Sequence, residues 1–145
     1  MTLFLRFRQI SGGFMPESGD LIGKENIKLN FILDDSEGYD GKIIVWSCFK
    51  AEVNYMKDKL GDKAVKFTGD ETDKQKEEAI NKFTNNPEVK YLIANPQSAA
   101  FGLNLQFCEL VYYFSRTLSP ELDAQSQDRC HRIGTKNNVV YKYLE

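Results

Sequence analysis

Two arginines and a glutamine near the end of the chain have a spacing that suits phosphate chemistry. Arg129 and Arg132 follow Gln125 at successive helical turns in the segment QSQDRCHRIG. At about 100° per residue, these three side chains share one stripe of a helix. The planar guanidinium group matches phosphate oxygens better than lysine does, and arginine is the rarer cation in this chain. A solvated polar face is the alternative interpretation, and it is the usual one for an isolated pair of arginines.

The flanking residues predict the helix that would carry this stripe. Ser119 is a favourable N-cap, Pro120 suits the first helical position, and Glu121 is an acid in the positively polarised first turn. Gly134 is a typical residue just after a helix end. The sequence therefore predicts one helix over residues 119–134.

A second motif, SAAFGLNL, spans Ser98 to Leu105. Together with the stripe it resembles motifs V and VI of the Swi/Snf-type ATPases, in the superfamily-two helicase group. The resemblance extends over most of the chain. Residues 42–47 (KIIVWS) are similar to motif IV, residues 67–69 (FTG) to the segment after it, and residues 5–10 to the stretch before the lobe.

The resemblance implies the second RecA-like lobe of a two-lobed, ATP-driven motor on double-stranded DNA. ATP and Mg²⁺ would be shared with a first lobe, which carries the P-loop and the acidic box of the family. Neither motif occurs in this sequence, so we expect the chain alone to be inactive in ATP hydrolysis. The expected partners are the first lobe and duplex DNA, and the chain itself is expected to be a monomer.

The resemblance also implies roles for single residues. Arg132 would be the arginine finger on the γ-phosphate, Arg129 its catalytic partner, and Gln125 the residue that orients the pair. An arginine of this kind stabilises the charge that phosphoryl transfer spreads over the equatorial oxygens. Gly102 and Asn104 would bind the nucleotide, although a turn glycine and a loop asparagine are the simpler interpretations of each alone. The positions that would touch the phosphates of one DNA strand are Ser47, Lys50, Thr68, Gly69 and Ser98.

Hydrophobic periodicity predicts the elements that must position these residues. Short apolar runs typical of buried parallel strands occur at 42–47, 64–68, 90–94, 109–114 and 138–143. Amphipathic or capped helical segments lie between or before them, at 3–10, 24–33, 49–60, 72–83 and 119–134. This alternation predicts an α/β fold with a three-layer arrangement, a parallel sheet with helices on both faces. Ligands of such sheets bind beyond the carboxyl ends of the strands, which is where the candidate residues fall.

Composition sets the limits of this interpretation. A chain of 145 residues with 41% hydrophobic residues suits one compact domain. We expect residues 1–40 to form a helix, a loop and a second helix that lead into the lobe, and residues 41–145 to form the RecA-like domain. The net charge of −2 argues against a surface that binds polyanions everywhere, so any nucleic-acid contact should be local.

Several other kinds of protein are disfavoured by what the sequence contains. Its three cysteines lack CxxC spacing, which predicts neither a disulfide framework nor a zinc site. There is no signal peptide and no apolar run of the roughly 20 residues that a membrane span needs. We therefore expect a soluble intracellular protein, cytoplasmic in a bacterium or phage and nuclear in a eukaryote.

The sequence was also compared with a phosphate-binding loop and with two alternative functions. The segment from Gly19 to Glu25 resembles a phosphate-binding loop, but it has too few residues between its glycines and no hydroxyl residue after its lysine. A Rossmann-like enzyme is not supported, because no GxGxxG motif occurs. A free-standing module that binds nucleic acid or a partner lobe without catalysis is the main alternative.

Overall fold

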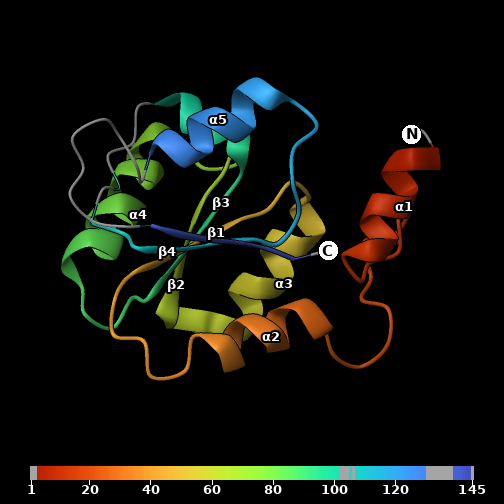
Figure 1. Ribbon diagram of the computed structural model, residues 1–145, viewed down its shortest axis with the longest axis horizontal. Coiled ribbons are helices and arrows are strands. Elements are labelled where there is room, and N and C mark those ends of the chain that lie inside the picture. Colours follow the sequence, from red (N-terminus) through yellow and green to blue (C-terminus); the bar gives the residue numbers. More distant parts are fainter. Residues whose placement is uncertain (1–2, 102–104, 106, 130–138, 145) are drawn as a thin grey trace.

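The computed structural model describes residues 3–101, 105, 107–129 and 139–144. Its centre is a five-stranded, all-parallel sheet in the order β2-β3-β1-β4-β5. The strands are β1 (Ile43–Trp46), β2 (Ala64–Phe67), β3 (Tyr91–Ala94), β4 (Leu110–Tyr113) and β5 (Val140–Tyr143). All five lie inside the predicted ranges, and the parallel α/β architecture with helices on both faces is confirmed (Figure 1).

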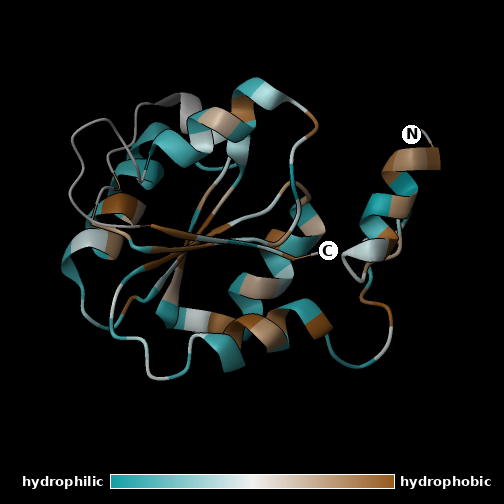
Figure 2. Cartoon of the chain, viewed as in Figure 1, coloured by the Kyte–Doolittle hydropathy of each residue, from teal (hydrophilic) through white to brown (hydrophobic). Residues whose placement is uncertain are grey.

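The central strands are apolar at every position because both faces of the sheet are covered. All four residues of β1, β3 and β4 are buried, whereas β5 at the sheet edge is only partly so. Figure 2 shows largely hydrophobic strands between helices that carry both hydrophobic and hydrophilic residues. The carboxyl ends of β1, β3 and β4 are in register, with Trp46 opposite both Ala94 and Tyr113. Residues that follow these strands are therefore brought to one edge of the sheet.

Helices α2 (Ile27–Asp35) and α3 (Lys50–Leu60) cover one face of the sheet. Leu29 and Ile32 of α2 and Val53 and Met56 of α3 are buried against it. The helix predicted over 24–33 begins later, because the Asn26 side chain accepts a 3.0 Å hydrogen bond from the Leu29 amide and so caps it.

Helices α4 (Asp73–Asn85) and α5 (Pro120–Asp128) lie on the opposite face (Figure 1). Thr72 and Gln75 form the predicted capping box at the start of α4, and Ala79 and Phe83 pack on the sheet. The described residues also include the 3-10 turns η1 (Gly61–Lys63) after α3 and η2 (Pro96–Phe101) after β3.

Helix α1 (Leu3–Ser11) stands beside this three-layer body and buries none of its own residues (Figure 1). The loop after it is better anchored, since Phe14 is buried and pairs with Leu21 as an isolated antiparallel bridge. The false phosphate-binding loop at Gly19–Glu25 lies partly in this hairpin-like turn and follows no named strand. None of the helices in the described ranges is long and apolar enough to cross a membrane.

Candidate nucleic-acid and nucleotide interface

A pocket of about 230 Å³ lies at the carboxyl ends of β1, β2 and β3. It brings together three residues that were predicted to touch DNA phosphates: Lys50 at the start of α3, and Thr68 and Gly69 after β2. Cys48, Val53, Asn54, Asp70, Asn95 and Gln97 form the rest of its lining. Because parallel strands end at the same edge, residues far apart in the sequence meet here. We call this set of lining residues the rim pocket.

Two other predicted DNA contacts are buried beside the rim pocket and do not line it. Ser47 is fully buried, and its Oγ donates a 2.7 Å hydrogen bond to Oε1 of Glu52. Ser98 is 2% exposed, and its backbone amide donates to the Asn95 carbonyl at 2.9 Å. In this structure, neither serine offers an exposed side chain at the rim.

Acidic side chains already bind Lys50 and Thr68 at the rim pocket. Lys50 Nζ lies 3.3 Å from Oδ2 of Asp70, and both side chains are largely exposed. Thr68 donates from both its amide and its hydroxyl to Oε2 of Glu71, at 2.7 and 2.6 Å. A phosphate at this edge would therefore meet one lysine whose charge is partly offset by a neighbouring carboxylate.

The predicted arginine-bearing helix is present in the described part of its range. Ser119 caps α5 by accepting from the Leu122 amide, and Pro120 occupies its first position, as predicted. The helix ends at Asp128, with Arg129 as its C-cap, and residues 130–134 of the predicted helix lie outside the described residues. The Arg129 carbonyl accepts a 2.9 Å hydrogen bond from the Leu105 amide. This contact comes from a distant loop, so no local pattern could have predicted it.

Gln125 and Arg129 both hold polar atoms that are buried and unpaired among the described residues. These atoms are Oε1 of Gln125 and Nε of Arg129, one helical turn apart. Unpaired buried polar atoms are uncommon in native proteins, and a partner for these two can come from residues outside the described ranges, from water or from a ligand. Arg132, Gly102 and Asn104 lie outside the described residues, so the predicted stripe is visible only at two of its three positions.

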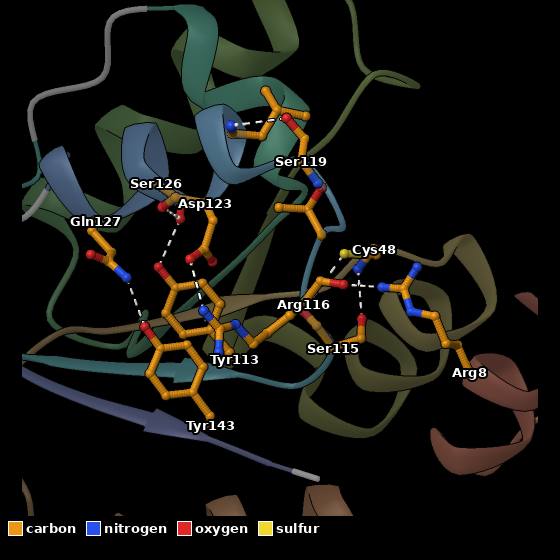
Figure 3. A network of polar contacts seen from close by, with 12 residues as sticks. Arg8, Cys48, Tyr113, Ser115, Arg116, Ser119, Asp123, Ser126, Gln127 and Tyr143 are labelled. Carbon is orange, nitrogen blue, oxygen red and sulfur yellow. Dashed lines mark hydrogen bonds and ion pairs between the residues drawn. The ribbon is translucent and has the colours of Figure 1, made fainter. Parts of the chain in front are cut away.

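A network of polar contacts joins α5 to the ends of β1 and β4 (Figure 3). Arg116 forms a 2.9 Å ion pair with Asp123 in the first turn of α5, and its guanidinium lies 4.2 Å from the centre of the Tyr143 ring. The Arg116 carbonyl accepts from the Arg8 guanidinium of α1. Residues from α1, β5 and α5 therefore converge on the loop after β4.

The same loop contacts a buried acid. Ser115 Oγ donates to Oε1 of Glu52 at 2.6 Å and accepts from the Cys48 amide at 2.8 Å. Burial raises the pKa of Glu52, while hydrogen bonds from Ser115 and Ser47 act in the opposite direction. Burial also raises the pKa of the Cys48 thiol, so this cysteine is not an activated nucleophile.

Glu52, Ser115 and Arg116 were not identified from the sequence. Glu52 looked like an ordinary acid in the first turn of a helix, and the two serines that bind it are far apart in the chain. The only available signal was an acidic residue within an otherwise amphipathic helix start. Within the described ranges, no group of histidine, cysteine, aspartate and glutamate residues could hold a metal ion.

Comparisons with known proteins agree on one family. The family profile of the helicase conserved C-terminal domain matches residues 24–134. The chain is similar to the SWI2/SNF2 ATPase core of Sulfolobus solfataricus in complex with double-stranded DNA, with 26% identity and a TM-score of 0.72. That match covers 98% of this chain and 31% of the solved one. The C-terminal part of the Fun30 ATPase domain shares the fold, with 24% identity, a TM-score of 0.65 and coverage of 79% and 37%.

Curated relatives give the same picture. The chromatin-remodelling ATPase INO80 of Candida albicans is 26% identical over 91% of this chain and 10% of its own length. An uncharacterised ATP-dependent helicase of Mycoplasma pneumoniae is 28% identical over 99% of this chain and 14% of its own length. The chain thus spans only a small part of the relatives that it matches.

Proposed function

Since this chain belongs to the helicase conserved C-terminal domain family, we propose that it is the second motor lobe of a Snf2-type ATPase that acts on double-stranded DNA. In this role it would supply arginines to a nucleotide held mainly by another lobe, and one side of a DNA track. The observation that carries the proposal is the pair of unpaired, buried polar atoms on Gln125 and Arg129. Both belong to the stripe that was selected from the sequence for phosphate chemistry.

One member of this pair fits a triphosphate: Nε of Arg129 is a donor, whereas Oε1 of Gln125 is an acceptor that can bind an N–H group and not a phosphate oxygen. Arg129 is a planar cation suited to phosphate oxygens, and Gln125 one turn earlier can orient it. We propose that Arg132 continues the stripe as the arginine finger and that Gly102 and Asn104 complete the nucleotide contact. Bound MgATP would supply the phosphoryl group and the metal, whose main ligands lie on the first lobe. The residues of this chain would stabilise the charge that develops during transfer.

The DNA track is proposed at the rim pocket. Lys50, Thr68 and Gly69 line one hollow at the sheet edge, where a lysine, a hydroxyl and a backbone amide can contact the phosphates of one strand. Ser47 and Ser98, which are buried, would support this surface from beneath. Contacts of this kind position a duplex without reading its sequence.

Steady-state ATP hydrolysis tests the proposal. The 145-residue chain alone should show no DNA-stimulated turnover, because it contains no P-loop. In a protein that joins this lobe to a P-loop lobe, Arg132→Ala should lower turnover by about 10³-fold or more, since the finger acts mainly in the transition state. Arg132→Lys should restore little, because a point charge does not reproduce the planar fork.

The control is Arg6→Ala, which removes an exposed arginine of α1 that lies outside the proposed site. Near-normal turnover in Arg132→Ala would remove the arginine-finger role, and a collapsed thermal melt would make Arg132 a structural residue. ATP hydrolysis by the pure chain would contradict the second-lobe assignment. If the chain binds DNA or a partner lobe and no variant changes any ATPase, the non-catalytic binding module is the better description.

A further inference from the structure

A buried carboxylate joins the ends of two neighbouring strands below the rim pocket. Glu52 of α3 is 1% exposed, and its Oε1 accepts from Ser47 Oγ at 2.7 Å and from Ser115 Oγ at 2.6 Å. Ser47 follows β1 directly, and Ser115 lies two residues after β4 ends. One oxygen atom therefore fixes the exits of two paired strands relative to α3.

The second oxygen of the same carboxylate is confined by the loop after α1. Oε2 of Glu52 is buried without a partner among the described residues. A Cβ added to Gly12 would lie 2.2 Å from it, far inside van der Waals contact. Because the two serines hold the other oxygen, Glu52 cannot easily move aside. A larger residue at position 12 would therefore have to displace this carboxylate.

Ser115 passes the constraint on in two directions. Its Oγ accepts from the Cys48 amide at 2.8 Å, and Cys48 lines the rim pocket. The next residue, Arg116, forms a 2.9 Å ion pair with Asp123 in the first turn of α5. Figure 3 shows this run of contacts from Cys48 through Ser115 and Arg116 to Asp123. Hydrogen bonds thus connect Glu52 with the rim pocket, and hydrogen bonds with one covalent step from Ser115 to Arg116 connect it with α5.

Ordinary packing does not account for this arrangement. A buried carboxylate is costly, and an apolar residue on this inward side of α3 would fill the space without that cost. A carboxylate that accepts two hydroxyl hydrogen bonds has a direction, which an apolar side chain lacks. It can therefore add a directional contact between α3 and the two strand exits, which an apolar side chain does not provide.

We propose that Glu52 is a positioning residue which, through Ser115, holds the rim pocket in a fixed relation to α5. The proposal rests on the proposed function only for the roles of the two regions that Glu52 connects: the rim pocket as a DNA track, and α5 as the helix that leads to Arg129. Glu52 itself would contact neither DNA nor nucleotide. It sets the geometry from which Lys50 on one side, and Gln125 and Arg129 on the other, would act.

Amide hydrogen exchange in the 145-residue chain tests the connection without any activity. Ser115→Ala removes both the donor to Glu52 and the acceptor for Cys48, and Ser115→Thr retains the hydroxyl. Leu60→Ala is the control, because it destabilises the far end of the same helix. Each variant is measured at the same number of degrees below its own melting temperature. In Ser115→Ala, the Cys48 and Asp123 amides should exchange about tenfold faster than in the control, through local opening. Ser115→Thr should restore slow exchange.

Equal exchange in Ser115→Ala and Leu60→Ala, or an effect that stops at Cys48, would overturn the proposal. If Ser115→Ala does not fold, Gly12→Ala provides the same comparison, because it displaces the carboxylate and leaves both serines in place. A two-lobed protein adds a second readout, in which Ser115→Ala should raise the DNA concentration for half-maximal ATPase stimulation several-fold and Ser115→Thr should not. Absence of any ATPase in the unmodified two-lobed protein would contradict the proposed function, whereas the exchange result alone decides the role of Glu52.

Discussion

Among single residues, Glu52 should make the stability of the fold depend on pH. Burial raises its pKa above the ordinary value, so the folded state favours the protonated acid. The stability from this group is then fully present below the unfolded pKa of about 4.3 and is lost as pH rises through the folded pKa. Glu52→Gln, which stays neutral, should unfold with a free energy that no longer falls over this range.

Denaturant unfolding at a series of pH values above 4 measures this difference, with exposed Glu88→Gln as the control for a lost carboxylate. A parallel pH dependence in Glu52→Gln and in the unmodified chain would show that folding does not raise the pKa of Glu52. The comparison of variants matters because other carboxyl groups of the unfolded chain titrate close to the same range.

The candidate site could be predicted at some residues and not at others for a physical reason. Lys50, Thr68 and Gly69 follow successive strands, and a parallel sheet places all such residues at one edge. Glu52 is different, because its role depends on two serines that reach it from separate strand ends. The spacing of these residues along the chain does not predict that contact.

For helices, the capping box of α4 provides a direct test of local sequence control. The Thr72 side chain accepts from the Gln75 amide, and the Gln75 side chain accepts from the Thr72 amide. Thr72→Ala should therefore lower the free energy of unfolding by about 1 kcal/mol. Thr84→Ala, near the exposed end of the same helix, is the matched control and should be close to neutral, since alanine favours helix and no cap is lost. Chemical denaturation decides it, and an equal loss in both variants would refute the capping role.

Helix starts were more predictable than helix ends. Thr72 and Ser119 are caps that act within four residues, so the sequence identifies them. At the end of α5, the Arg129 carbonyl accepts from the Leu105 amide, which belongs to a different loop. The apolar face of a strand also needs only local pattern, which explains why all five strands were found.

At the scale of the whole molecule, the parallel architecture was predictable because alternating strands and helices permit few arrangements. The long-range contacts that complete this architecture were not predictable from the sequence. The carboxylate of Asp35, at the end of α2, accepts from Tyr112 of β4 and pairs with Lys142 of β5. This contact fastens α2 to the edge strand across most of the length of the chain.

The charge of the whole molecule predicts how the isolated lobe should bind DNA. With a net charge of −2 and Lys50 paired to Asp70 at the rim pocket, duplex binding should be weak. Its affinity should fall with salt on a shallow logarithmic slope of roughly −1 to −3, as expected when few counterions are released.

Asp70→Asn should tighten binding by up to about fivefold at low salt, because a unit charge near a phosphate changes the energy by about 1 kcal/mol in water. Asp62→Asn changes the net charge equally, but it lies in η1 before β2, at the opposite edge of the sheet. Fluorescence anisotropy with a short labelled duplex compares the two variants: a gain confined to Asp70→Asn supports the rim pocket as the DNA track, and equal gains in both would reduce the effect to net charge alone.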